Sequence, residues 1–149
     1  MHEYRATTTW KRTSSDFTYD TYNRAHDVTF GSGTKVPWSS APEFKGEVDR
    51  VNPEEAFVAA LSTCHMLTFL SVAARKRFVV DSYADEAVGV VERNAQGKYW
   101  VSKVTLRPKV TFSGDRQPSA QEISALHHAA HDNCFIANSV TSSVSIDET

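Results

Sequence analysis

A long apolar segment with a well-marked start limits what this chain can fold into more than any other feature. Residues 52–55 read Asn-Pro-Glu-Glu. That order favours a helix start, because Asn caps free N–H groups, Pro suits the first helical position, and carboxylates complement the positive end of the helix dipole. Residues 56–74 are apolar or small on nearly every face, and the basic run 75–77 follows them. We therefore predict a long central helix, buried in a core or in a subunit interface.

The chain before this helix predicts β-structure, because apolar and β-branched residues alternate there between turn residues. The predicted strands fall at 4–11, 17–19, 26–30 and 35–38, with a Gly-Ser-Gly turn at 31–33. Residues 39–51 include Pro42 and Gly46 and are too polar and interrupted for a regular element. This region therefore predicts N-terminal antiparallel strands.

After the central helix the pattern returns to strands and then to a second helix. Residues 79–93 and 99–112 predict two strands joined by a turn. A capping-box sequence at 119–122 begins a helix that ends near residue 133, and residues 140–146 alternate as a closing strand. The order of strands, helix, strands, helix and strand predicts an α+β fold. No linker or repeat divides the chain, so we expect a single domain over residues 1–149.

Charge and composition argue against several classes of function. The net charge of −2 gives no electrostatic reason to expect a nucleic-acid partner. We find no apolar run of the roughly 18 to 20 residues that a membrane span needs. The first residues also lack the apolar core of a signal peptide. We therefore expect a cytoplasmic protein without a nucleic-acid or membrane partner.

The two cysteines, Cys64 and Cys134, carry the main chemical question. In a reducing compartment a thiol is inert, metal-binding or catalytic. A thiol in the middle of a buried helix is reactive only beside a cation, and His65, Arg24 and Arg50 are the candidates. A redox pair needs one cysteine in a cationic pocket and one on an element able to reach it. Cys134 follows the second predicted helix and fits the latter role, although spacing alone also allows inert thiols.

A competing site consists of His127, His131 and Cys134, which share one face of a continuous helix at positions i, i+4 and i+7. Imidazole and thiolate ligands at that spacing suit zinc or another transition metal. Histidines on a solvated helix face are the simpler interpretation. A metal site would also need a fourth ligand from elsewhere in the chain.

The run from Asn52 to His65 resembles the OsmC/Ohr family (osmotically inducible protein C and organic hydroperoxide resistance protein). In that family an Asn-Pro-Glu helix start precedes the peroxidatic cysteine, and Glu54 and Cys64 keep the family's ten-residue spacing. The family's second cysteine follows a second helix, where Cys134 stands. The resemblance covers the length and element order of the whole chain. Phe135 departs from the proline that often follows the second cysteine, which indicates a divergent OsmC-like branch.

The resemblance implies an intertwined α+β homodimer with two active sites at the subunit interface. It implies that Cys64 reduces an organic hydroperoxide, that Cys134 resolves the product as a disulfide, and that a cellular dithiol restores both thiols. An Arg–Glu pair activates the first cysteine in this family. Glu54 matches the glutamate, and Arg24 is our candidate for the arginine, with Arg50 as its rival. No metal or organic cofactor is implied.

Helix geometry adds a constraint on Glu54. At 1.5 Å per residue, a straight helix places Glu54 about 15 Å along the axis from Cys64. Either the helix breaks near residues 57–60, or Glu54 serves the active site of a partner subunit, and we predict the second.

The sequence thus predicts a cysteine-based peroxidase that acts on organic hydroperoxides in oxidative stress defence. Two alternatives stay open. One is a metal-binding or redox-sensing protein that uses His127, His131 and Cys134, and the other is a non-catalytic binding domain on the same fold. For the peroxidase we expect an aromatic pocket wall from the region of Trp38, Phe57 and Phe69.

Overall fold

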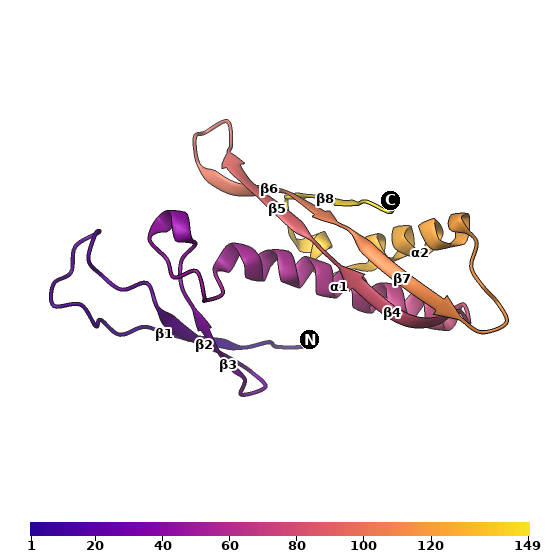
Figure 1. Cartoon of the computed structure of the whole chain (residues 1–149), viewed down its shortest axis with the longest axis horizontal. Helices are drawn as coiled ribbons and strands as arrows, with labels where there is room; N and C mark the ends of the chain where they lie inside the picture. Colours follow the sequence, from indigo (N-terminus) through magenta and orange to yellow (C-terminus); the bar gives the residue numbers. More distant parts are fainter. The chain divides into compact units, whose positions relative to one another are not determined.

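The computed structural model describes all 149 residues, which divide into two compact units, Met1–Ala56 and Phe57–Thr149. The expectation of a single domain over residues 1–149 stays a prediction. The folding class is α+β, as predicted from the order of the elements. Figure 1 shows the three N-terminal strands in indigo and the later strands and helices in magenta to yellow.

The first unit contains one antiparallel sheet, in the order β1 (Ala6–Thr9), β2 (His26–Phe30) and β3 (Lys35–Trp38). A short 3-10 helix, η1 (Pro42–Phe44), lies in the predicted irregular stretch. Gly46 is required in this stretch, because a Cβ there would lie only 1.6 Å from the carbonyl oxygen of Ser40.

The strand predicted at 17–19 is absent. Phe17 instead packs its ring against Trp10 and Tyr22, at centroid distances of 6.0 and 5.3 Å. The side chain of Asn23 holds the surrounding loop by accepting from Thr13 N and donating to Lys11 O. The aromatic residues at 17–19 therefore belong to a loop, where Phe17 packs in an aromatic cluster, and not to a strand.

The central helix α1 spans Pro53–Arg75, in agreement with its predicted start and end. Asn52 Oδ1 accepts a hydrogen bond from Glu55 N at 2.9 Å, and a Glu55 carboxylate oxygen accepts one from Asn52 N at 3.3 Å. This reciprocal pair satisfies two backbone donors at the helix start.

Only one face of α1 is buried within the chain, at Leu61, His65, Phe69 and Ala73. Within a single chain the core therefore covers only this face of α1, and burial of the rest in a subunit interface stays a prediction. The expectation that no segment is apolar enough to cross a membrane is wrong, because α1 meets that test by length and composition. Core helices of soluble proteins meet the same test.

The second unit contains two small sheets. One pairs β4 (Val79–Asp85) with β7 (Pro108–Ser113), and the other has the order β5 (Val88–Arg93), β6 (Tyr99–Leu106) and β8 (Ser143–Ile146). The pairing of β8 with β6 is parallel and all others are antiparallel. Each predicted long strand is thus broken in two. The break is fixed at Asp85, whose Oδ1 accepts a hydrogen bond from Arg107 N at 2.6 Å.

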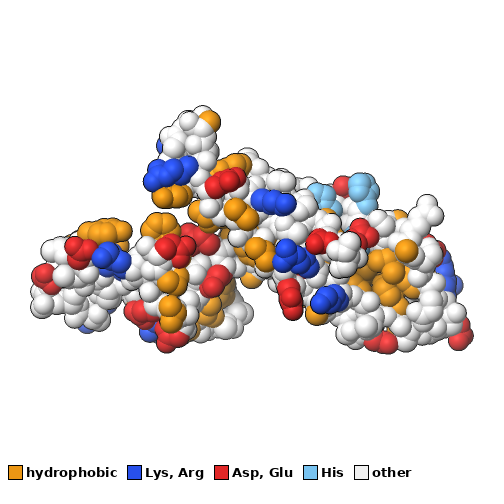
Figure 2. Space-filling model, turned by 45° about the horizontal axis from the view of Figure 1, so that its top comes forward, with side chains coloured by type: hydrophobic (Ala, Val, Ile, Leu, Met, Phe, Trp, Pro, Cys, Tyr) orange, Lys and Arg blue, Asp and Glu red, His pale blue; other side chains and the backbone are white.

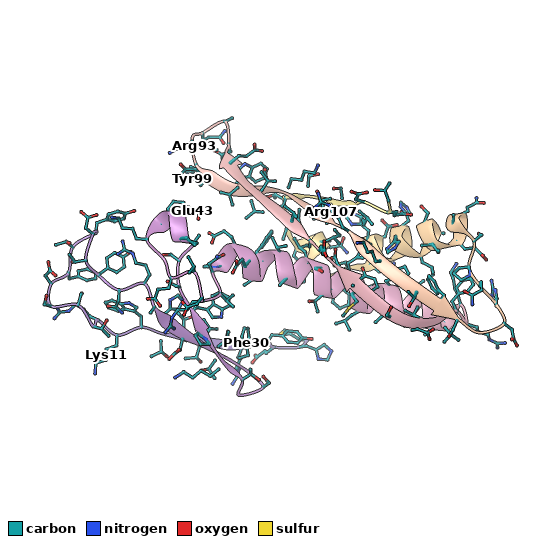
Figure 3. The ribbon with its side chains drawn as sticks, viewed as in Figure 1. Lys11, Phe30, Glu43, Arg93, Tyr99 and Arg107 are labelled. Atoms are coloured by element: carbon teal, nitrogen blue, oxygen red, sulfur yellow. The ribbon has the colours of Figure 1, made fainter.

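The far end of the β5–β6 hairpin is held by an aromatic contact, visible in Figure 3. The guanidinium of Arg93 lies 4.2 Å from the centre of the Tyr99 ring and donates to Tyr99 Oη at 3.1 Å. This contact stabilises the turn at residues 94–98.

The second helix α2 (Ala120–Asn133) begins at the predicted capping box, formed by Ser119 and Glu122. Two apolar clusters then fill the second unit. In the first, Phe69 and Ala73 of α1 pack with Phe78 and with Leu126 and Ala130 of α2. The second cluster consists of Leu61, Val104 and Leu106. The core therefore fixes α1 against α2 and against the sheets, which positions the side chains described next.

Candidate active site

The two cysteines come together, although 70 positions separate them in the sequence. Cys64 lies in the middle of α1 and is half-buried, and Cys134 caps the end of α2 and is fully buried. Both are free thiols, and the Cys64 side chain lies close enough to Cys134 to influence the pKa of its thiol. The packing of α1 against α2 therefore places two thiols within reach of each other.

The environment of Cys134 favours the protonated form of its thiol. Burial raises the pKa of Cys134 to about 11, and the nearby Cys64 side chain acts in the same direction. The backbone N–H of Ala137, which donates to Cys134 Sγ at 3.4 Å, opposes this effect in part. Near neutral pH, Cys134 is therefore a thiol that can donate its hydrogen toward Cys64.

The turn that follows Cys134 includes a 3-10 helix, η2 (Ala137–Ser139). Asn138 N donates to Cys134 O at 3.0 Å, and Ser139 Oγ donates to Phe135 O at 2.7 Å. The Phe135 side chain is exposed. A few local hydrogen bonds thus hold the residues around Cys134, with Phe135 at the surface.

His65, next to Cys64 in the sequence, belongs to a buried histidine pair. Its Nε2 lies 3.0 Å from Nδ1 of His127, and the His127 ring packs 4.4 Å from the ring of Phe69. Burial lowers the pKa of His65 to about 4, and the proximity of His127 and His131 adds to the effect. His65 is therefore neutral near pH 7 and does not supply a cation to Cys64.

The low pKa of His65 predicts an acid-sensitive fold. An unfolded chain protonates this histidine as the pH falls below about 6.5, whereas the folded chain does so only near pH 4. We expect the free energy of unfolding to decrease by up to about 3 kcal/mol between pH 7 and pH 4 on account of His65. Urea unfolding at several pH values measures this loss.

His65→Leu should lack this part of the pH dependence. His128→Gln is the control, because the His128 side chain is 81% exposed. Equal pH dependence of unfolding in wild type and His65→Leu would contradict the assignment.

The alternative metal site finds no support in the structure, which brings no three His, Cys, Asp or Glu side chains into an arrangement able to hold a metal ion. His127 directs its Nδ1 to His65 instead of sharing a centre with His131 and Cys134. His127 and His131 lie on α2 as predicted, but the helix ends at Asn133 and the backbone of Cys134 is extended, so the three residues do not share one continuous helix.

Arg24 lies in the first unit and is buried there. Its guanidinium stacks 3.6 Å from the centre of the Tyr22 ring, and its Nη atoms donate to the backbone carbonyls of Tyr22 and Tyr19. Its Nε is buried without a hydrogen-bond partner. Arg50, the rival candidate, is paired with Glu47 at 2.6 Å. Arg24 is thus the candidate with a donor that is buried and has no acceptor in the chain.

Glu54 does not pair with Arg24 within the chain, since its carboxylate forms no ion pair or side-chain hydrogen bond. The helix is continuous from Pro53 to Arg75, so the alternative of a break near residues 57–60 is excluded. The assignment of Glu54 and Arg24 to one site stays a prediction.

A pocket of about 480 Å³ lies beside Arg24 in the first unit. Its aromatic wall comes from Trp10, Phe17 and Tyr22, and His26 also lines it. None of the expected wall residues lines this pocket. The Trp38 ring lies 6.4 Å from the ring of His26 without lining the pocket, Phe69 is fully buried in the core, and Phe57 packs against the cluster around Leu61. The sequence could have indicated this wall, because Trp10, Phe17 and Tyr22 lie close to Arg24 along the chain.

Comparison with known proteins places the chain in a family. Residues 45–149 match the family model described as OsmC-like protein. A Vibrio cholerae OsmC-like protein of unknown function is 49% identical, with a TM-score of 0.95 and 99% of each chain covered. The uncharacterized protein YmaD of Bacillus subtilis is 26% identical over 129 residues, 83% of each chain.

More distant structures share the fold. The organic hydroperoxide resistance protein OhrB of Bacillus subtilis is 18% identical, with a TM-score of 0.71 and coverage of 98% of this chain and 97% of that one. An organic hydroperoxide resistance protein from Elizabethkingia anophelis is 17% identical, with a TM-score of 0.74 and coverage of 100% and 98%. The family match, the 49% identical relative and the common fold together show that this chain belongs to the OsmC-like protein family.

Proposed function

We propose that this protein is a cytoplasmic cysteine-based peroxidase that reduces organic hydroperoxides in oxidative stress defence. The observation that carries the proposal is the proximity of the Cys64 and Cys134 thiols, which the packing of α1 against α2 brings together. Two thiols brought together from distant parts of a chain can form a disulfide without a large rearrangement. The family membership supports the same function, as does the shared fold with two organic hydroperoxide resistance proteins.

The proposed reaction has three steps. The Cys64 thiolate attacks the distal oxygen of the hydroperoxide, the O–O bond breaks, and the alkoxide takes up a proton and leaves as an alcohol. The resulting Cys64 sulfenic acid condenses with the Cys134 thiol, which forms the disulfide and releases water. A cellular dithiol then reduces the disulfide and is itself oxidised. Each cycle transfers two electrons from the dithiol to the peroxide, with no metal or organic cofactor.

The surroundings of the two cysteines support a different role for each of them. Cys134 remains protonated near neutral pH, because burial and Cys64 raise its pKa. Its S–H can therefore stabilise negative charge on Cys64 before the peroxide arrives. The N–H of Ala137 can in turn stabilise negative charge on Cys134 as it attacks the sulfenic acid. Cys64 is thus assigned the peroxidatic role and Cys134 the resolving role.

We also propose that the protein acts as a homodimer in which Glu54 orients Arg24 of the partner subunit. The side of α1 away from the core exposes Ala60, Thr63, Leu67, Ser71 and Ala74. These residues recur every three or four positions, so they form one continuous face of small and apolar residues. Figure 2 shows other hydrophobic side chains at the surface as well. Such a face is suited to close packing against a second copy of the chain.

A charge in the middle of this face should separate the subunits. Leu67 is 58% exposed in one chain, so Leu67→Glu adds little strain to the monomer. We expect Leu67→Glu to sediment as a monomer and to lose most peroxidase activity, because the partner's carboxylate no longer reaches the site.

Val48→Glu is the matched control, because Val48 is 85% exposed and lies outside α1. It should retain both the dimer and the activity. A dimeric and active Leu67→Glu protein would rule out this face as the interface.

The proposed activity is tested by mixing reduced protein with tert-butyl hydroperoxide while peroxide and free thiols are counted. Wild type should lose both thiols and consume one peroxide per disulfide formed. Wild type that keeps both thiols and consumes no peroxide would disprove the peroxidase function.

A further inference from the structure

The pocket beside Arg24 has two side-chain nitrogen atoms, on Arg24 and His26, that form no hydrogen bond within the chain. It lies wholly within residues 1–56, and Trp10, Phe17 and Tyr22 form its apolar side. Arg24 and His26 both line it. Pockets of this kind bind apolar molecules and orient them through a few polar contacts.

Arg24 contributes a hydrogen-bond donor. The residue is 8% exposed, and both of its Nη atoms already donate to backbone carbonyls. Its Nε–H is buried and has no acceptor in the chain. Leaving a charged group's donor unpaired and buried is costly, so an oxygen atom of a bound ligand would be a favourable acceptor.

His26 contributes an acceptor. Its Nδ1 lies 2.8 Å from the backbone carbonyl oxygen of Arg24. A carbonyl oxygen only accepts, so Nδ1 carries the hydrogen, and Nε2 of the neutral ring holds a lone pair. Nε2 forms no hydrogen bond within the chain and is not enclosed by it. The same carbonyl contact fixes both the tautomer of His26 and its position beside Arg24.

We propose that His26 accepts the O–H hydrogen bond of an apolar hydroperoxide bound in this pocket, and that it thereby selects ligands with an O–H group. The assignment deepens the proposed peroxidase function and rests on it for the identity of the substrate. A hydroperoxide offers an acceptor oxygen to Arg24 Nε–H and an O–H to His26 Nε2, whereas an ether or ester offers only the acceptor. His26 is a binding residue that orients the distal oxygen, since that oxygen carries the hydrogen.

Two unreactive probes test the assignment independently of catalysis. They are 2-phenyl-2-propanol and its methyl ether, which share an aromatic body and differ in the O–H group. Their dissociation constants can be measured from the tryptophan fluorescence of the reduced protein, because Trp10 lines the pocket. We expect wild type to bind the alcohol about tenfold more tightly than the ether.

Two variants of His26 distinguish the role of Nε2 as a hydrogen-bond acceptor from a purely structural role of the imidazole ring. In His26→Asn the side-chain amide can still donate to the Arg24 carbonyl, but the Nε2 acceptor is lost. The alcohol-to-ether preference should then fall to about one. His26→Gln places an amide oxygen near the position of Nε2 and should restore part of the preference. A purely structural role for His26 would weaken both probes equally and leave their ratio unchanged.

The outcomes distinguish this assignment from the peroxidase proposal. Wild type that binds neither probe, or binds both equally, overturns the assignment whatever the variants do. An unchanged ratio in His26→Asn overturns it as well. If wild type shows the predicted preference but consumes no tert-butyl hydroperoxide, the peroxidase function fails while the role of His26 as an O–H acceptor stands.

Discussion

Cys64→Ser is expected to abolish peroxide consumption, with a loss of activity of at least about a thousandfold. A serine hydroxyl does not ionise near neutral pH and is a poor nucleophile toward a peroxide, whereas a thiolate is a strong one. The substitution is nearly isosteric, and Cys64 is only half-buried, so the fold should persist. The measurement is the consumption of tert-butyl hydroperoxide in the presence of excess dithiothreitol.

Cys134→Ser gives the informative contrast to Cys64→Ser. Without a resolving thiol, Cys64 should still reduce one equivalent of peroxide and stop as a sulfenic acid, which dimedone traps. Cys134→Ser should therefore show a single stoichiometric turnover when no external thiol is present. If Cys134→Ser were inert and Cys64→Ser active, the roles of the two cysteines would be reversed.

Arg24→Lys is expected to lower kcat/KM for the hydroperoxide by about 10- to 100-fold. Lysine keeps the positive charge but lacks the planar fork and the Nε–H, and a lost charge-stabilising donor has an effect of this size. The side chain is buried and its Nη atoms hold two backbone carbonyls, so thermal unfolding should be measured in parallel.

Arg50→Lys is the matched control for Arg24→Lys. Arg50 pairs with Glu47 on the surface of the same unit, so its replacement by lysine should change kcat/KM less than twofold. A loss confined to Arg50→Lys would identify Arg50 as the activating residue and would overturn the choice of Arg24.

The parts of the fold that could be predicted from the sequence are those with local causes. Asn52 and Glu55 form a capping pair three residues apart, as do Ser119 and Glu122, and both helices begin where expected. The breaks in the long strands could not be predicted in this way. They depend on a hydrogen bond from Arg107 N to Asp85, which only the folded chain brings into contact.

The same distinction applies to the candidate site. The pairing of Cys64 with Cys134 was predicted from a resemblance that carries long-range information. No local pattern indicated that His65 would pair with His127, 62 positions away, or that this pairing would keep His65 neutral. The expectation that Phe69 lines a pocket was wrong for a related reason. Phe69 is apolar enough for either location, and only the packing of α1 against α2 and the β4–β7 sheet decides that it is buried.

The central claim is that peroxide drives formation of a disulfide between Cys64 and Cys134. The most direct measurement is mass spectrometry of wild type after one equivalent of tert-butyl hydroperoxide, followed by digestion without reduction. We predict an intact mass lower by two hydrogen atoms and a cross-linked peptide pair that contains Cys64 and Cys134. A protein whose mass is unchanged, with both cysteines recovered as free thiols, would contradict the account.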